Sequence, residues 1–399
     1  MSERVPEGWS VSNLGQQIDI LSGFPFKSSE FTNDPSDFGL IRIRDLLSQK
    51  LETFYAGEYS TDFIVKIGDI LIGMDGDFHI VQWKSQNALL NQRICKLVPK
   101  KGGFDINFVH YLLIPELKKI HNQTTATTVK HLSVKDIREV EQAFPPLPEQ
   151  KKIASILTSV DEVIETTQKQ IEKLQDLKKA TMNELLTKGI GHTEFKDSKL
   201  GRIPKSWEVM SIEKLSDRII DYRGKSPPKA KTGIPLITAK NIRMGFIDKN
   251  PREYIGEHSF DTWMVRGIPR LGDIFFTTEA PLGFISLVPE YKHAVGQRVI
   301  TISPKRKVFS SNFLCYFLQG ATFQKQIIDA STGSTVTGVK QSTLRNALTL
   351  VPTLNEQERI SNIIKSIETK MIHVSAKLAQ TQSLKKSLMQ DLLTGEVRV

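Results

Sequence analysis

The chain has 399 residues and a formal charge of +10, because 54 residues are Lys or Arg and 44 are Asp or Glu. Hydrophobic residues make up 39% and charged residues 25% of the sequence, which excludes a largely disordered or collagen-like chain. At about 100–200 residues per domain, this length predicts two to four domains. The basic surplus favours a polyanionic partner, nucleic acid first and an acidic membrane second.

The N-terminal residues and the cysteines indicate the cellular compartment of the protein. The first residues, MSERVPEGWS, lack the apolar core of a secretory signal, and no run of about 18 apolar residues occurs. We therefore expect a cytoplasmic protein that does not contact a membrane. The two cysteines, Cys95 and Cys315, lie in the apolar contexts RICKL and FLCYF. They are predicted to be buried reduced thiols, and a zinc site built from several cysteines is excluded.

Four segments follow one another along the chain. Residues 1–146 contain short apolar runs bounded by Gly, Pro, Asn and Asp, such as QRICKLVP, which predicts a strand-rich domain with a few short helices. Residues 147–190 are predicted to form one long helix. Residues 191–352 are predicted to form a second strand-rich domain, with runs such as QRVITISP, and residues 353–399 a second long helix.

These segments form an internal repeat, since matching motifs occur in the same order in both halves. PEGW is matched by PKSW, GDIL by GDIF, NQR by GQR, and LPEQ by LNEQ. The offset between matching residues is 198 at Trp9 and Trp207, and it reaches 207 at Gln150 and Gln357. Such small drifts are expected when two copies of one fold differ in their loops.

The offset of 207 then holds to the end of both long helices. A continuous helix requires this, because one inserted residue would rotate every later side chain by about 100°. Mostly apolar residues recur in steps of three and four along each helix, which predicts that the two rods, each about 60 Å long, pair with each other. The alternative is that each packs only on its own domain or on another subunit. The apolar seam positions are Leu157, Val160, Ile164, Ile171, Leu174, Leu185, Ile364, Ile367, Met371, Val374, Leu378, Leu388 and Leu392.

The sequence lacks the motifs of the enzymes that modify or move along DNA. The string KSPPK is the nearest approach to the Asn/Asp-Pro-Pro-aromatic loop of amino-group methyltransferases, and it lacks both the amide or carboxylate and the ring. No GxxxxGK[ST] or GxGxxG loop occurs, and the Glu-x-Lys pairs are expected by chance in a chain rich in both residues. The eight histidines have no HExxH spacing. We therefore expect no catalytic residues and no metal site.

The motifs together resemble the specificity subunit of type I restriction–modification systems. A PxGW opening, a variable strand-rich domain, a P-L-x-E-Q helix start and an L-K-K…L-L-T-x-G helix end, all repeated, carry this resemblance over essentially the whole chain. Asn355 replaces the proline of the first copy, Pro148, and IPKSW lacks the usual glycine. The family implies an α+β fold with two strand-rich target-recognition domains joined by two long antiparallel coiled-coil helices. An internal pseudo-two-fold axis would relate the two copies.

The resemblance also implies partners. Each target-recognition domain would read one half of a bipartite DNA site, while the helices would set the spacer and dock two methyltransferase subunits. Restriction subunits, which combine the nuclease and the translocase, would join that core. We expect S-adenosylmethionine, ATP and Mg²⁺ on those partner subunits and no cofactor on this chain. Because the two domains differ far more in sequence than the helix ends do, the half-sites should differ, giving an asymmetric target.

The residues that contact DNA are expected among polar and basic side chains in loops at the ends of repeated strands. Three groups also have a structural explanation: ordinary strand-edge residues, turn-forming carboxylates, and arginines that tie strands together. The hydroxyl-rich loops that lead to Lys130 and Lys340 are candidates for phosphate contact, and Lys27 and Lys225 rank below them. The repeated QR dipeptide favours the structural role for Gln92-Arg93 and Gln297-Arg298. The candidates are Lys27, Arg42, Arg44, Asp75, Asp77, Phe78, Gln92, Arg93, Thr125, Thr128, Lys130, Lys225, Lys240, Asn241, Arg243, Thr278, Glu279, Gln297, Arg298, Ser334, Thr335 and Lys340.

Two other classes of function remain at this point. A self-contained DNA-modifying enzyme would show catalysis by the isolated chain. A coiled-coil scaffold protein would bind protein through its domains and would lack the salt-dependent affinity for one bipartite duplex that a DNA reader must have.

Overall fold

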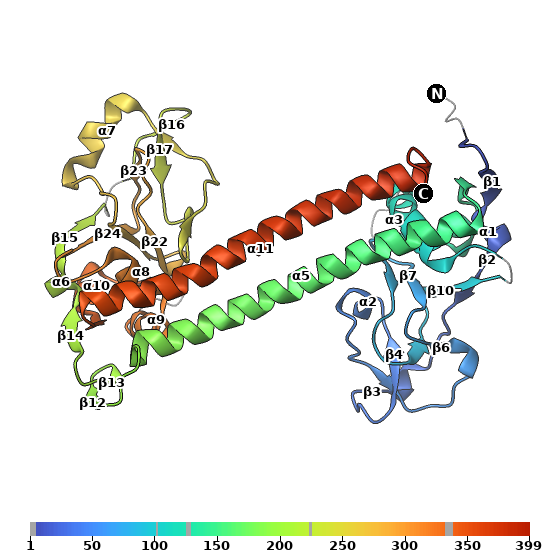
Figure 1. Cartoon of the computed structure of the whole chain (residues 1–399), viewed down its shortest axis with the longest axis horizontal. Helices are drawn as coiled ribbons and strands as arrows, with labels where there is room; N and C mark the ends of the chain where they lie inside the picture. Colours follow the sequence, from blue (N-terminus) through green and yellow to red (C-terminus); the bar gives the residue numbers. More distant parts are fainter. Residues whose placement is uncertain (1–4, 101–102, 125–128, 223–225, 332–337) are drawn as a thin grey trace. The chain divides into compact units, whose positions relative to one another are not determined.

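The computed structural model describes residues 5–100, 103–124, 129–222, 226–331 and 338–399. The chain divides into two compact units (Figure 1). The first unit comprises residues 1–168 and 376–399, and the second comprises residues 169–375. Each long helix therefore contributes one segment to each unit.

The described residues of the first unit form three sheets. Their strand orders are β1-β11, β2-β10-β7-β8 and β3-β5-β4-β9-β6, and all pairs are antiparallel except β4 with β9. The elements are β1 (Ser10–Asn13), α1 (Leu14–Gln17), β2 (Ile18–Ser22), η1 (Ser28–Glu30), β3 (Phe31–Thr32), β4 (Phe38–Ile41), α2 (Asp45–Ser48), β5 (Phe54–Tyr55), η2 (Thr61–Phe63), β6 (Ile64–Val65), β7 (Ile70–Gly73), β8 (Ile80–Gln82), β9 (Ala88–Leu90), β10 (Ile94–Pro99), α3 (Ile106–Gln123), α4 (Val134–Arg138) and β11 (Glu141–Phe144).

Over its described residues, the second unit repeats this topology with two further hairpins and with four strands in place of the five of β3-β5-β4-β9-β6. The sheets β14-β25, β15-β24-β21-β22 and β16-β20-β17-β23 correspond to those of the first unit, and the hairpins β12-β13 and β18-β19 are further pairs. The elements are β12 (Phe195–Ser198), β13 (Gly201–Pro204), β14 (Glu208–Ser211), α6 (Ile212–Leu215), β15 (Ser216–Asp221), β16 (Lys229–Ala230), β17 (Ile234–Ile237), β18 (Ile242–Arg243), β19 (Phe246–Ile247), β20 (Tyr254–Ile255), α7 (Glu257–Trp263), η3 (Met264–Arg266), β21 (Ile274–Thr278), β22 (Leu282–Leu287), β23 (Ala294–Val295), β24 (Val299–Pro304), α8 (Ser311–Gln319), α9 (Ala321–Asp329), α10 (Gln341–Asn346) and β25 (Leu348–Val351).

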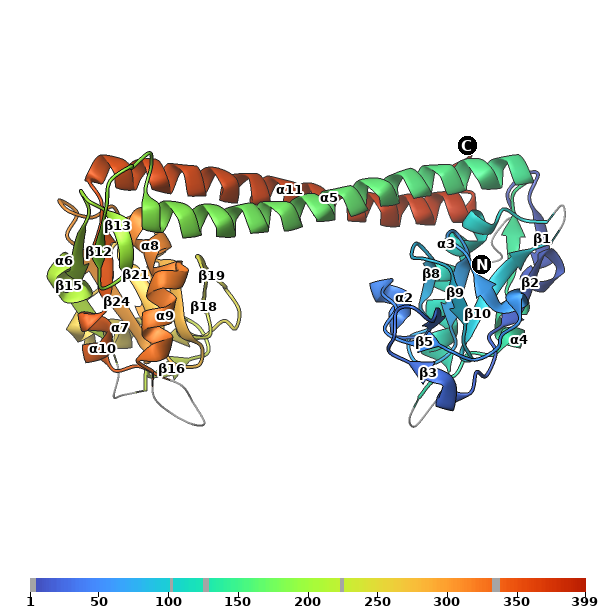
Figure 2. The same ribbon diagram turned by 90° about the horizontal axis from the view of Figure 1, so that it is seen from below.

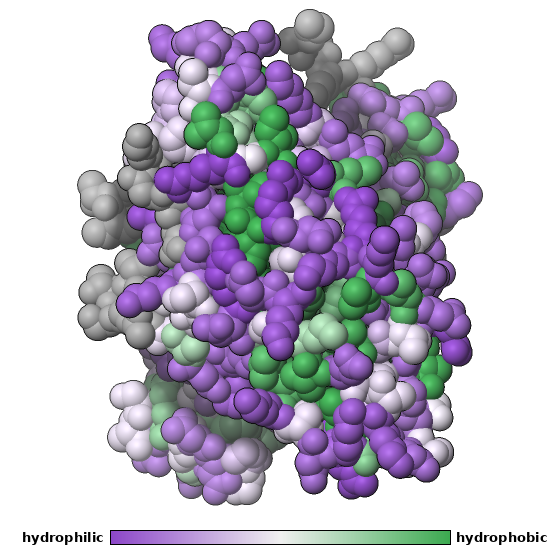
Figure 3. Space-filling view, turned by 90° about the vertical axis from the view of Figure 1, so that its left-hand side faces the viewer, coloured by the Kyte–Doolittle hydropathy of each residue, from purple (hydrophilic) through white to green (hydrophobic). Residues whose placement is uncertain are grey.

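Each unit has a core of aliphatic and aromatic side chains between helices and one sheet, β2-β10-β7-β8 in the first unit and β15-β24-β21-β22 in the second. In the first unit α3 packs against the sheet containing β7, whose four residues are all buried. In the second unit α8 and α9 take the place of α3 and pack against β21 and β22. Figure 3 shows one face of the second unit, where hydrophilic residues surround smaller apolar patches. Both cysteines are buried, as predicted, and burial raises the pKa of each thiol to about 12.

The long helices are α5 (Leu147–Lys188) and α11 (Leu354–Thr394). In each unit a segment of α5 lies beside a segment of α11 that runs in the opposite direction (Figures 1 and 2). Every predicted seam residue is buried or half-buried, whereas most residues between them are exposed. The seam therefore packs inward along both helices, as the three- and four-residue steps predicted.

The glutamine of each LPEQ or LNEQ motif anchors a long helix to its own domain. Gln150 accepts a hydrogen bond from the backbone N–H of Asp105, the residue that caps α3, at 2.9 Å. Gln357 likewise accepts from the N–H of Ser310, the residue before α8, at 2.8 Å. Both glutamines are at most 1% exposed, and each also donates to a backbone carbonyl. The repeated motif thus fixes the direction in which each helix leaves its domain.

The glycine that ends each long helix packs against the tryptophan that opens a domain. Gly189 has a φ of +67°, and a Cβ there would lie 2.7 Å from the Trp207 ring. Gly395 has a φ of +74°, and a Cβ there would lie 2.5 Å from Pro6 and 3.1 Å from Trp9. Only glycine accommodates both this left-handed conformation and this close approach.

Candidate nucleic-acid interface

In the first unit, a carboxylate, an arginine and a histidine meet at one end of the four-stranded sheet. Asp75 follows β7, and Arg93 immediately precedes β10. Asp75 Oδ1 lies 2.6 Å from Nδ1 of His131, and Asp75 Oδ2 lies 3.7 Å from Nε of Arg93. The Arg93 side chain is still 57% exposed, so its guanidinium is oriented by Asp75 without being enclosed.

The second unit has the same arrangement with different partners. Glu279 follows β21, and Arg298 immediately precedes β24. Glu279 Oε1 lies 2.7 Å from Nε of Arg298, whose side chain is 48% exposed. Glu279 also forms a backbone bridge with Gly338, the counterpart of the bridge between Asp75 and His131. A glycine therefore stands where the first unit carries an imidazole.

Both arginines adopt a left-handed backbone conformation that non-glycine residues rarely occupy. The φ angles are +70° at Arg93 and +71° at Arg298. Each of these arginines accepts a backbone hydrogen bond through its carbonyl, from Met74 N at 2.8 Å and from Thr278 N at 3.0 Å. Such strain persists where surrounding contacts enforce it, and it is concentrated at functional sites. The repeated QR dipeptide thus occupies a defined, strained turn in both units.

Several candidates gather around these two turns. Lys130 accepts a backbone bond from Gly76, beside Asp75, and donates through its amine to the carbonyl of His121. Asp77 lies 3.7 Å from His121 and 3.8 Å from His79. In the second unit Lys340 is exposed and follows Val339, which bonds to the Thr278 carbonyl. His79 and His121 belong to this cluster, although the sequence did not single them out. His79 follows Phe78 directly along the chain, whereas only folding brings His121 to Asp77.

Two candidates at these turns are buried. The Phe78 ring, a candidate to contact DNA, is 2% exposed and packs edge-on against His121 at 5.3 Å. Thr278 is 2% exposed, and its hydroxyl donates to the Arg298 carbonyl at 3.3 Å. The expectation that these side chains contact DNA is corrected, because both are buried inside the domain.

Other candidates lie after the strands β4 and β17, away from the arginine turns in sequence and in sheet. Arg42 and Lys240 are exposed. Arg44 is 55% exposed and lies 3.4 Å from Glu52. Lys27, a further candidate outside the two turns, is exposed, and within the turns Gln92 is exposed and Gln297 half-exposed. Thr125, Thr128, Lys225, Ser334 and Thr335 lie outside the described residues.

Asn241 and Arg243 serve internal contacts, which corrects their expected role in reading bases. Asn241 is 4% exposed; its carbonyl accepts from Thr238 and its amide donates to the carbonyls of Asp248 and Pro251, at 3.1 and 2.9 Å. Arg243 donates to the Lys240 carbonyl and lies 3.3 Å from Asp248. Neither side chain has the free edge that a bidentate base contact needs.

No group of three or more His, Cys, Asp or Glu side chains within the described ranges is arranged to hold a metal ion. In the same part of the chain, no helix combines the length and apolar character that crossing a membrane requires.

The comparisons with known proteins agree with the repeated fold. The family model of the type I restriction modification DNA specificity domain matches residues 6–176 and again residues 204–381. The chain belongs to this family. It provides DNA sequence specificity in a type I restriction–modification system, and the α+β architecture with two repeated target-recognition domains is confirmed.

Similar proteins come from distant organisms. The chain is 28% identical to the type I restriction enzyme EcoBI specificity subunit of Escherichia coli, covering 98% of this chain and 87% of that protein. It is 27% identical to the MjaVIII specificity subunit of Methanocaldococcus jannaschii, covering 99% and 94%. The crystal structure of the type I S subunit from M. genitalium matches with a TM-score of 0.62 at 15% identity over 98% of each chain. This likeness extends over the whole fold.

Proposed function

We infer that this specificity subunit reads an asymmetric bipartite DNA target, one half through each arginine turn. The main support is that the same left-handed arginine turn occurs in both units with different side chains around it. Arg93 is oriented by an aspartate and accompanied by His131, whereas Arg298 is oriented by a glutamate beside Gly338. Arginine held by a carboxylate presents its remaining N–H groups in a fixed plane, which suits the O6 and N7 acceptors of guanine. Different neighbours should then select different adjacent bases.

The chain itself is proposed to be non-catalytic and to act with partner subunits in the cytoplasm, where the DNA lies. The family implies two methyltransferase subunits and further restriction subunits, with S-adenosylmethionine, ATP and Mg²⁺ bound by those partners. Exposed leucines support a docking role for the long helices. Leu177 and Leu384, which occupy equivalent positions in α5 and α11, are 50% and 53% exposed. Two equivalent apolar positions suit two copies of one partner.

The experiment is to compare methylated adenines in cells that carry the wild-type chain, Arg93→Ala or Arg298→Ala, together with the same methyltransferase. Arg93→Ala should relax one half-site and Arg298→Ala the other, with about tenfold weaker binding to the original target in each case. Lys118→Ala, which also removes one positive charge at an exposed position of the first unit, is the control. Equal loss at both half-sites from either arginine variant would contradict two separate readers.

A further inference from the structure

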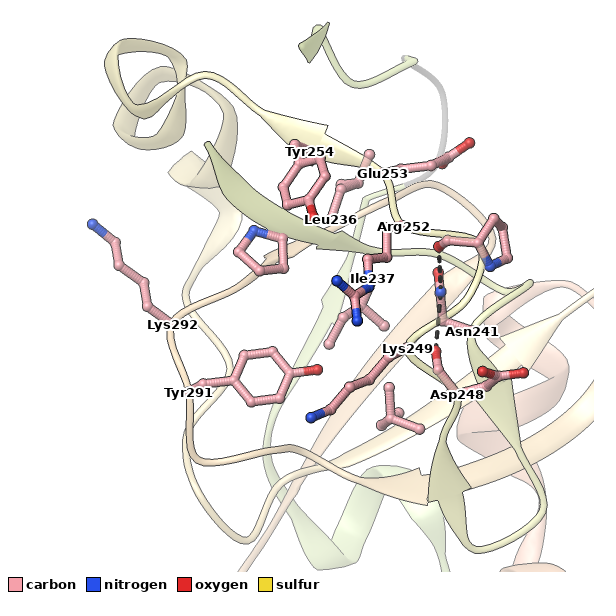
Figure 4. Close-up of a pocket in the computed structure, with 13 residues that line it drawn as sticks. Leu236, Ile237, Asn241, Asp248, Lys249, Arg252, Glu253, Tyr254, Tyr291 and Lys292 are labelled. Atoms are coloured by element: carbon pink, nitrogen blue, oxygen red, sulfur yellow. Dashed lines mark hydrogen bonds between the residues drawn. The ribbon is translucent and has the colours of Figure 1, made fainter. Parts of the chain in front are cut away.

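A cavity of about 510 Å³ lies in the second unit, apart from the arginine turn (Figure 4). It is lined by Leu236 and Ile237 of β17, by Ile247, and by the tyrosines Tyr254 and Tyr291. A volume of about 300–1,000 Å³ with a mainly apolar lining and a few polar groups is typical of sites for small ligands.

The cations of this cavity are not all neutralised by the protein. Asp248 lies 3.3 Å from Arg243, and Glu253 lies 2.7 Å from Lys229, so both carboxylates of the lining are paired with cations that do not line it. Neither Lys249 nor Arg252 has an ion-pair or hydrogen-bond partner among the described residues. Figure 4 shows the amine of Lys249 and the guanidinium of Arg252 directed into the space beside Tyr291.

The segment that carries these cations is held in place by Asn241. Its amide donates to the carbonyls of Asp248 and Pro251, on either side of Lys249 and directly before Arg252. The first unit has Asp45 at the matching position, where the carboxylate accepts from the N–H of Arg42. A carboxylate cannot donate to those carbonyls. The buried asparagine is thus specific to the second unit.

The loop itself also differs between the copies. Paired residues place Phe54 of β5 and Tyr254 of β20 at equivalent positions. Arg42 and Thr238 are equivalent too, because each donates its N–H to the Asp45 or Asn241 side chain. The second unit therefore has four more residues in this loop. The extra length forms the β18-β19 hairpin, where the first unit has the short helix α2.

We propose that this cavity takes one nucleotide of the bound DNA, with its base against the tyrosine rings and its phosphate on Lys249 and Arg252. Aromatic rings stack with any base, and cations without an acidic partner are available to a phosphate. The proposal rests on the second unit contacting DNA. It makes Asn241 a positioning residue, and it gives the second unit a contact that the first unit, with Asp45, cannot build in the same way.

The test uses the full chain assembled with its methyltransferase and duplexes containing the methylated target, determined beforehand in cells. Each nucleotide in and next to the second half-site is replaced in turn by an abasic analogue, and affinity is measured for the wild-type chain and Tyr291→Ala. At one position the abasic analogue should weaken wild-type binding about tenfold and should have no further effect on Tyr291→Ala. Arg252→Gln should weaken binding. It should also reduce the slope of log affinity against log salt concentration by about the amount of one phosphate contact. Lys199→Gln, an exposed charge change in the same unit, is the control.

Additive effects of Tyr291→Ala and the abasic analogue at every position would overturn the proposal. A parallel titration uses deoxynucleoside 5′-monophosphates without DNA. If these bind the wild-type chain and not Tyr291→Ala, while DNA affinity is the same for both, the cavity serves free nucleotides and the DNA assignment is wrong. Wild-type binding without preference for the target would instead refute the reading function, so the two failures are distinguishable.

Discussion

The amine of Lys178 lies 2.7 Å from Oε1 of Glu368, an ion pair between α5 and α11 in the second unit. The hydroxyl of Tyr316 in α8 donates to the other oxygen of the same carboxylate at 2.6 Å. The first unit repeats this triad with residues at equivalent positions. There, Lys385 of α11 lies 2.6 Å from Asp161 of α5, and Tyr111 of α3 donates to Asp161 at 2.8 Å.

Each triad joins both long helices to one domain, so its loss should weaken a whole unit. Lys178→Ala removes a charged partner from a carboxylate whose side chain is 28% exposed, and we expect the free energy of unfolding to fall by roughly 1–3 kcal/mol. Urea unfolding measures this. The exchange Lys178→Glu with Glu368→Lys should restore part of the loss. An exchange no more stable than the single variants would show that the ion pair contributes little.

Gln357 is fully buried and makes three hydrogen bonds, to the N–H of Ser310 and to the carbonyls of Val308 and Pro352. Gln357→Ala leaves these backbone groups without partners in the interior, and we expect a destabilisation of roughly 2–4 kcal/mol in thermal or urea unfolding. Gln170→Ala, at an exposed position of α5, should change stability far less. Equal stability of the two variants would refute the anchoring role.

Stability should depend on pH through His110. Burial, together with the nearby Lys385 charge, lowers the pKa of His110 from 6.5 to about 4. The unfolded chain therefore binds a proton that the folded chain does not, between about pH 6.5 and pH 4, so stability falls as the pH falls through this window. The contribution reaches roughly 3 kcal/mol at the acidic end. In His110→Gln, the slope of the unfolding free energy against pH in this window should fall by the equivalent of about one proton. An unchanged slope would show that His110 does not cause the pH dependence.

The helix pairing predicts how the spacer between half-sites can be altered. Four residues inserted after Gln168 and four after Ser375 fall at the boundaries of the units, so both lysine triads keep their partners. Four added residues lengthen a helix by about 6 Å and one base pair spans about 3.4 Å, so the methylated sites should gain one or two base pairs of spacer with unchanged half-sites.

An insertion in only one helix is the control for that experiment. It shifts one long helix along the other, so we expect a lower free energy of unfolding and no methylation of sites with a longer spacer. If the double insertion alters a half-site and keeps the spacer, the helices do not set the distance between the domains.

The repeat was readable from the sequence because it rests on local rules. The constant offset of 207, the seam from Leu157 to Leu392, and the glycines after each helix all reflect helical periodicity and backbone preference. The strand-rich character of both domains followed from short apolar runs between turn residues. The family resemblance came from the same motifs. These features therefore needed no knowledge of contacts between distant residues.

Which side chains face outward was decided by the tertiary structure alone. The sequence offered Phe78, Asn241 and Arg93 as candidates to contact DNA and favoured a structural role for Arg93. Packing buries Phe78 and Asn241 and leaves the Arg93 side chain 57% exposed. Asp75 and His131 are 56 residues apart, and only the pairing of their backbones brings them together. Local patterns specify an element's own periodicity, whereas the exposure of a loop side chain depends on the distant segments that pack around it.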